Sequence, residues 1–178
     1  MSNQIKHKNQ RVGVFIDASN MYFSAQNLYR TNVNFKGILD AAVEKRQLIR
    51  AFCYVIESDK EKEKDFLQML LDLGIEPRSK PLQVFQGGAK KGDWDVGLTI
   101  DVVRMLPILD VVILVSGDGD YCDLLDYVRG HGRRTEVIAF GKTTSSKLIE
   151  TADEFVDIES NRRMFLIGRS RGVRKSSR

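Results

Sequence analysis

Aspartates follow two apolar segments of the chain, where their carboxylates could hold a metal ion. Asp17 comes directly after the apolar run 12–16, and Asp118 and Asp120 follow the run 111–115 within "SGDGD". Carboxylates crowded into one crevice raise one another's pKa, so such a cluster persists most readily when a cation neutralises it. Oxygen ligands favour Mg²⁺ or Mn²⁺, which keep positions open for water and phosphate. This pattern predicts a metal centre suited to phosphodiester hydrolysis.

A third acidic segment, "KKGDWDVGLTID", opens with two lysines. Asp95 is expected to be the N-cap of a helix, and Asp101 lies six residues later, about 120° around that helix. Asp95 is therefore the better ligand candidate, with Asp101 in a supporting position and Asp93 as an alternative ligand. Lys90 and Lys91 precede the aspartates and are candidates for holding a nucleic-acid backbone.

Polar residues beside these acids have candidate roles of their own. Asn20 lies one helical turn beyond Asp17 and could orient a water or a phosphate oxygen, while Ser116 could touch a metal-bound water. Structural roles compete with these: Asp17 suits a turn, Asn20 suits a helix N-cap, and Asp120 suits the cap of the helix that follows it. The chain has two histidines, which leaves little material for a zinc site or a histidine-based triad.

The elements expected to position these residues alternate between strand and helix. Apolar runs predict buried strands, and the intervening segments have helical periodicity, which together indicate a parallel sheet covered on both faces. The expected strands are 12–16, 49–57, 111–115, 135–140 and 155–158, with 76–88 as an edge strand or irregular hairpin. The expected helices are 21–29, 35–46, 58–73 with a capping box of Ser58 and Glu61, 95–106, 121–128 and 144–152.

The connections between these strands also predict which acids meet. Right-handed crossovers allow the strand order 3-2-1-4-5, in which the first strand and the 111–115 strand are neighbours. Ligands bind such sheets beyond the carboxyl ends of the strands, where the order reverses. We therefore expect Asp17 and Asp118 to face one crevice.

The net charge of +4 conceals an acidic body with basic ends. Three basic residues lie in 1–11 and seven in 162–178, with no acid in either segment; without those ten, 18 basic residues face 24 acids, a net charge of −6. Basic ends of this kind can attract phosphate backbones, or can simply aid solubility. Cys53 and Cys122 stand in apolar contexts and are expected to be buried free thiols.

Three stretches, "VFIDASNMY", "KGDWDVGLTIDVV" and "VILVSGDGDYCDLL", occur in an order and spacing that resembles the NYN domain of the LabA-like group in the PIN-like nuclease superfamily. The resemblance spans roughly residues 11–158. It implies a Rossmann-like three-layer α/β/α sandwich with a mostly parallel sheet, and a metal-dependent ribonuclease site. By motif, the site residues carried over are Asp17, Asn20, Asp95, Asp101, Asp118 and Asp120.

"KGDWD" has one residue more than the commoner lysine-glycine-hydrophobic-aspartate form of the family, so the ligand position falls on either Asp93 or Asp95. Asp95 keeps the six-residue spacing to Asp101. The resemblance makes RNA, in single-stranded form, the expected partner. It also leaves open a homodimer.

The chain is expected to be one cytoplasmic domain without a membrane segment, divided into a basic tail (1–10), the NYN domain (11–166) and a basic, disordered tail (167–178). An alternative is a regulatory module that keeps the acidic pocket and binds RNA or a protein without cutting. A phospho-acceptor receiver domain, using Asp17, Ser116 and Lys142, is disfavoured because the third strand region ends with no aspartate to accept a phosphoryl group.

Overall fold

The computed structural model describes residues 6–57, 60–84, 90–91 and 93–168. Its centre is a six-stranded sheet in the order β3-β2-β1-β6-β7-β8, with every neighbouring pair parallel. These strands are β1 (Arg11–Asp17), β2 (Gln47–Glu57), β3 (Glu76–Pro81), β6 (Val111–Val115), β7 (Arg134–Ala139) and β8 (Glu154–Asp157). The predicted strand order is confirmed, and β8 extends it by a sixth strand.

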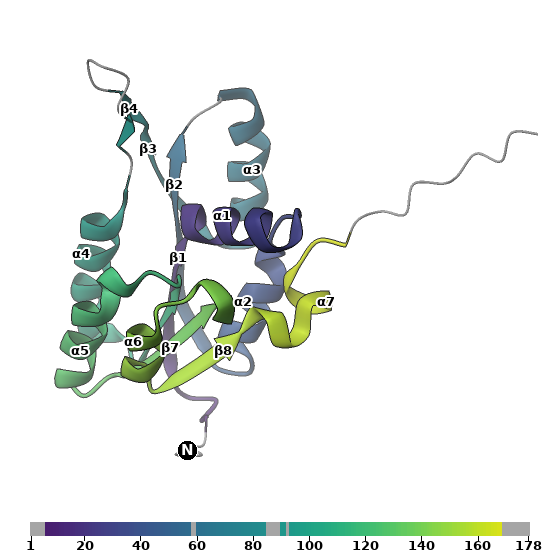
Figure 1. Ribbon diagram of the computed structural model, residues 1–178. Coiled ribbons are helices and arrows are strands. Elements are labelled where there is room, and N and C mark those ends of the chain that lie inside the picture. The colour runs from purple at the N-terminus through teal and green to yellow at the C-terminus, as the bar shows by residue number, and fades with distance from the viewer. Residues whose placement is uncertain (1–5, 58–59, 85–89, 92, 169–178) are drawn as a thin grey trace, which may run out of the picture.

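Helices cover both faces of the sheet, as expected for parallel strands. They are α1 (Ala18–Tyr29), α2 (Phe35–Val43), α3 (Lys60–Asp72), α4 (Asp95–Met105), α5 (Cys122–Gly130), α6 (Ser146–Thr151) and α7 (Arg162–Phe165). Figure 1 shows α4 and α5 on one side of the sheet and α1, α2 and α3 on the other. The chain changes face between β3 and β6, and this reversal places the start of α1 beside the loop after β6.

The stretch 76–88, expected to be an edge strand or an irregular hairpin, begins with β3 at the edge of the sheet. β3 pairs with β2, and a small antiparallel hairpin follows, formed by β4 (Gln83–Val84) and β5 (Lys90–Lys91). The proposed helix cap at Ser58 lies outside the described residues. Asp95 is the first residue of α4 and Trp94 is its N-cap, so the prediction of Asp95 as the N-cap was wrong by one position.

The core is continuous across the central strands. All five residues of β6 are buried, as are Val12 and residues 14–16 of β1. Strands covered on both faces need apolar side chains on both, which is why these runs show no alternation. Cys53 and Cys122 are free and buried, as predicted.

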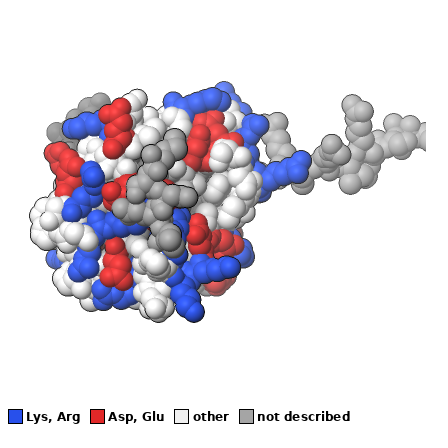
Figure 2. Space-filling model, turned by 90° about the horizontal axis from the view of Figure 1, so that it is seen from below, with Lys and Arg blue, Asp and Glu red and all other residues white. Residues whose placement is uncertain are grey.

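A buried ion-pair network lies at the amino-terminal edge of the sheet. Arg46, in the turn before β2, donates two hydrogen bonds of 2.8 Å to the carboxylate of Glu136 on β7. Arg134 donates to the same carboxylate and to Glu154 on β8, and Lys6 pairs with Glu154 at 2.8 Å. The molecule seen from below, in Figure 2, carries interspersed basic and acidic side chains rather than a patch of one sign.

Candidate functional site

The site begins where β1 and β6 end side by side. Ile16 pairs with Val115 in the parallel register, so the next residues, Asp17 and Ser116, emerge together. The Ser116 hydroxyl donates to Asp17 Oδ2 at 3.2 Å, and Asp17 Oδ1 accepts from the Asn20 backbone N–H at 3.0 Å. Asp17 is therefore both the N-cap of α1 and a carboxylate at the mouth of the sheet.

The loop after β6 is fixed by side chains on both flanks. Asn20 Oδ1 accepts from the Gly117 N–H at 2.9 Å, which ties α1 to this loop. Asp118 Oδ1 accepts from the Asp120 N–H at 3.0 Å and so caps the 3₁₀ turn Gly119–Tyr121, whereas the N-cap of α5 is Tyr121 rather than the predicted Asp120. The side-chain oxygen of Asn20 therefore positions the loop after β6, a role that the sequence did not indicate.

The two glycines of "SGDGD" are required by close packing. A Cβ at Gly117 would lie 2.7 Å from Thr144 Oγ1, and a Cβ at Gly119 would lie 2.9 Å from Ser145 Oγ. Both neighbours belong to the segment after β7, and the Ser145 N–H donates to the Gly117 carbonyl at 3.0 Å. The close approach of this segment, more than the approach of a ligand, therefore explains both glycines.

The start of α4 brings in the third acid. The Trp94 indole N–H donates to the Val55 carbonyl at 2.9 Å, and its ring lies 5.5 Å from that of Tyr54, which fixes α4 against β2. The Tyr121 hydroxyl then donates to Asp95 Oδ1 at 3.0 Å. These contacts hold the Asp95 carboxylate toward the loop after β6.

The acids converge on a cavity of about 200 Å³. It is lined by Asp17, Ser19, Asn20, Ile56, Asp93, Trp94, Asp95 and Asp118. Asp95, Asp118 and Asp120 each place one oxygen within 4.8 Å of the others. Asp17 lines the cavity but lies outside this group of three, whereas Asp120 belongs to the group but does not line the cavity. Oxygens on opposite sides of a Mg²⁺ ion lie about 4.2 Å apart, which is close to the spread of this group.

Electrostatics inside the cavity disfavour the bare carboxylates. Burial raises the pKa of Asp17, and the charges of Asp95 and Asp118 raise it further against the hydrogen bonds from Asn20 and Ser116. Burial also raises the pKa of Asp95, with added repulsion from the neighbouring aspartates. A divalent cation would relieve this repulsion, and an all-carboxylate donor set fits Mg²⁺ or Mn²⁺.

The other predicted residues either lie outside the cavity or have side chains that the structure does not describe. Asp101 accepts a 3.1 Å hydrogen bond from Tyr54 and lies 3.6 Å from Arg78, without lining the cavity. Lys90 and Lys91 form β5, but their side chains lie outside the described residues. Lys142 pairs with Glu159 at 3.0 Å.

The motifs and the fold agree with a comparison against known families. The sequence matches the profile of the NYN domain over residues 11–159. The chain belongs to the NYN-domain family.

Two relatives of this NYN domain illustrate the match. It is 23% identical to the low amplitude and bright protein LabA of Synechococcus elongatus, over 85% of this chain and 86% of that protein. It is 32% identical to a protein of unknown function from Vibrio parahaemolyticus whose crystal structure superposes with a TM-score of 0.82, covering 92% of this chain and all of the other. The fold of this chain is thus shared with a solved protein to which it is 32% identical.

Two residues of the NYN domain's site escaped the sequence prediction. Tyr121 has the spacing of an apolar core residue with Leu124, Leu125 and Val128; it is buried, yet its hydroxyl donates to Asp95. Buried tyrosine hydroxyls normally require a polar partner, and that rule was the available signal. Nothing in the sequence around Trp94 indicates its hydrogen bond to the Val55 carbonyl.

Within the described residues, no helix has the length and apolar character needed to cross a membrane.

Proposed function

We propose that this NYN domain is a Mg²⁺- or Mn²⁺-dependent ribonuclease that hydrolyses phosphodiester bonds of single-stranded RNA. The observation that supports this most strongly is the convergence of Asp95, Asp118 and Asp120 within 4.8 Å, with Asp17 on the same cavity. NYN domains of the PIN-like superfamily are generally metal-dependent and RNA-directed, which agrees with this donor set.

The proposed metal ligands are Asp17, Asp95, Asp118 and Asp120, and Asp93 is the alternative to Asp95. Asp93 is exposed, whereas Asp95 is half-buried and oriented by Tyr121, which favours Asp95. A divalent ion held there would acidify a water and neutralise the charge that develops on the phosphate, so no histidine base is needed.

The surrounding residues keep the carboxylates in place. Ser116 and the Asn20 N–H hold Asp17 in one rotamer, and Asn20 fixes the loop that carries Asp118. Asp101 would act indirectly, by anchoring Tyr54 against Trp94. Lys90 and Lys91, on the hairpin that precedes α4, are proposed to contact the RNA backbone.

Cleavage of a labelled single-stranded RNA, with Mg²⁺ and separately with Mn²⁺, tests this function. Asp17→Asn and Asp118→Asn should each lower the cleavage rate about 100-fold or more, since a catalytic metal stabilises the transition state by several kcal/mol. Asp123→Asn, on the exposed face of α5, is the matched control and should cleave like the parent.

The proposal fails if the parent cleaves with neither metal, or if the two variants cleave as fast as the control. RNA binding by a parent that does not cleave would instead support the regulatory binding module, the second function considered for this fold.

A further inference from the structure

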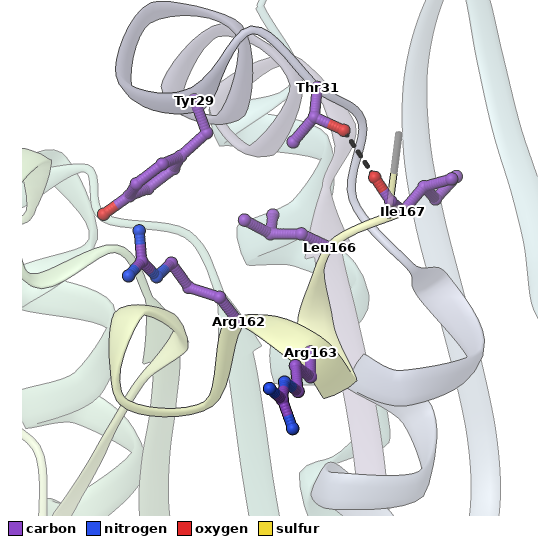
Figure 3. Close-up of a pocket in the computed structure, with 7 residues that line it drawn as sticks. Tyr29, Thr31, Arg162, Arg163, Leu166 and Ile167 are labelled. Atoms are coloured by element: carbon purple, nitrogen blue, oxygen red, sulfur yellow. Dashed lines mark hydrogen bonds between the residues drawn. The ribbon is translucent and has the colours of Figure 1, made fainter. Parts of the chain in front are cut away.

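A second, larger cavity of about 510 Å³ lies at the far end of α1 (Figure 3). It forms where the segment after α7 returns to the loop between α1 and α2, and it is lined by Tyr29, Thr31, Arg162, Arg163, Leu166, Ile167 and Gly168. The Ile167 N–H donates to the Asn32 carbonyl at 2.9 Å, and the Thr31 hydroxyl donates to the Ile167 carbonyl at 2.7 Å. These bonds hold the walls of the cavity in place before any ligand arrives.

The lining combines apolar surface with unpaired positive charge. Leu166 is half-buried and Ile167 is 55% exposed, while Arg162 and Arg163 are exposed and form no ion pair with any described residue. Figure 3 shows Arg162 directed toward Tyr29, and its guanidinium carbon lies 5.2 Å from the ring centre.

The acid beside this cavity is already neutralised. Glu159 accepts from the Tyr29 hydroxyl and pairs with Lys142 at 3.0 Å. Arg30, next to Tyr29, is also exposed. The cavity therefore offers an arginine-rich rim around an apolar and aromatic surface, which suits a nucleotide whose base lies on the apolar surface and whose phosphate meets the arginines.

One helix connects this cavity to the acidic one. Ser19 and Asn20, at the start of α1, line the acidic cavity, and Tyr29 at its end lines the second. The 12 residues of α1 span about 18 Å.

Between the two cavities, α1 exposes two aromatic side chains. Tyr22 is 52% exposed and Phe23 is 61% exposed, and their rings are 5.6 Å apart, edge to face. Because seven residues complete nearly two turns, Tyr22 lies on the same flank of α1 as Tyr29. Exposed aromatics between a phosphate-binding rim and a hydrolytic site are typical of surfaces on which single-stranded bases stack.

The charge distribution of the molecule favours RNA contacts outside the acidic cavity. Residues 12–161 carry a net charge of −6, and the acidic cavity itself repels phosphate until a cation enters it. Attraction for a polyanion must therefore come from basic groups outside that cavity. Residues 169–178, which follow Gly168 at its rim, add five bases and no acid to the sequence.

We propose that single-stranded RNA lies along α1, with bases stacked on Tyr22 and Phe23 and a phosphate held by Arg162 and Arg163 in the second cavity. This inference rests on the proposed RNA substrate. It adds an accessory binding site about one helix length from the proposed cleavage site.

Binding of a labelled single-stranded RNA of about 16 nucleotides, measured by fluorescence anisotropy in EDTA, tests the site without cleavage. The double variant Arg162→Ala/Arg163→Ala should weaken binding about tenfold or more. The slope of log affinity against log salt should become shallower by about 0.7, since the two arginines are proposed to hold one phosphate and each phosphate neutralised on a single strand contributes about 0.7. Tyr22→Ala/Phe23→Ala should weaken binding by a similar factor and leave the salt slope unchanged, because stacking releases no counterions.

The matched control is Lys45→Ala/Arg104→Ala, which removes two exposed positive charges, one in the turn before β2 and one on α4, which lies on the side of the sheet away from α1, and should bind nearly as the parent does. The proposal is overturned if both the α1 and the α7 variants bind RNA like this control, or if the parent does not bind RNA in EDTA. Unchanged RNA binding by both variants would instead indicate that the surface along α1 and the second cavity binds a protein partner. Cleavage with Mn²⁺ is measured separately. A parent that binds RNA along α1 but does not cleave it would refute the proposed ribonuclease activity and support the proposed accessory binding site.

Discussion

Asp17 carries an electrostatic strain that a metal ion would remove. Its half-buried carboxylate faces Asp95 and Asp118, and its pKa is raised in the folded protein. An acid with a raised folded-state pKa binds its proton more tightly when folded, so its contribution to stability is lost as the pH rises through that pKa. At neutral pH, the metal-free protein is therefore destabilised by this cluster.

Asp17→Asn should consequently raise the melting temperature of the metal-free protein at pH 7. The amide can still accept from the Asn20 N–H while losing the charge, and 1 kcal/mol corresponds to roughly 2–4 °C in a chain of this size. Scanning calorimetry in EDTA and then in Mn²⁺ measures this, and Mn²⁺ should stabilise the parent more than the variant. A variant that melts below the parent in EDTA would show that the charge of Asp17 does not oppose folding.

The individual acids of the site could be predicted because carboxylates after buried strands stand out in the sequence. Asp17, Asp95 and Asp118 line one cavity, as expected. Tyr121 could not be assigned because its spacing is that of an ordinary core residue, and its partner lies 26 residues away. Asn20 was selected for a role toward substrate, whereas its oxygen holds the Gly117 N–H.

At the level of elements, the site depends on how closely the loop after β6 packs against the segment that follows β7. Gly117 has no space for a side chain, since its Cβ would lie 3.1 Å from the Thr144 Cα as well as 2.7 Å from its hydroxyl oxygen. Ser116 and Asp118 flank Gly117. The Ser116 hydroxyl donates to Asp17 and accepts from the Asp118 N–H. A displacement of this loop therefore moves two parts of the proposed metal centre.

Gly117→Ala should destabilise the protein by about 1–3 kcal/mol through overpacking, and should reduce RNA cleavage more than stability alone would explain. Gly130→Ala, near the end of α5, is the matched control, because a Cβ there meets nothing within 4 Å. Urea unfolding should show that control unchanged or more stable by about 0.5–1 kcal/mol. Equal behaviour of the two variants would remove the packing argument.

The strand order was predictable because handed crossovers leave few arrangements for this sequence of strands and helices. The residues that cap the helices were harder to predict than the strand order. Both Asp95 at α4 and Asp120 at α5 were assigned as caps, and each lies next to the actual N-cap residue, Trp94 or Tyr121. Neither Trp94 nor Tyr121 makes a side-chain hydrogen bond to the free N–H groups, so the preference of caps for aspartate did not locate these helix starts.

At the scale of the whole molecule, a buried pair of charged residues, Arg46 and Glu136, lies at the amino-terminal edge of the sheet, opposite the acidic cavity. Burial alone would raise the pKa of Glu136, but hydrogen bonds from Arg46 and Arg134 outweigh it, and the pKa is lowered. The stability this gives is present above the ordinary pKa of glutamate and is lost as the pH falls through the lowered value. The sequence did not reveal this network, because Glu136 reads as one acid in an apolar strand and its partner Arg46 is 90 residues away.

Glu136→Gln should lower the free energy of unfolding by about 3–5 kcal/mol, since it leaves the buried Arg46 guanidinium without its counter-charge. Glu44→Gln, which affects the more exposed pair with Lys6, should cost about 1 kcal/mol or less. Chemical denaturation at pH 7 compares them. A loss for Glu136→Gln no larger than that for Glu44→Gln would show that the network does not stabilise the fold.

The acidic cavity is proposed to bind a divalent cation, and calorimetric titration of Mn²⁺ into the metal-free protein at pH 7 tests this most directly. The parent should bind Mn²⁺, and Asp95→Asn/Asp118→Asn should weaken binding about 100-fold or more, because it removes two of the three clustered carboxylates. Absence of Mn²⁺ binding by the parent, or equal binding by the double variant, would contradict the assignment of this cavity as a metal centre.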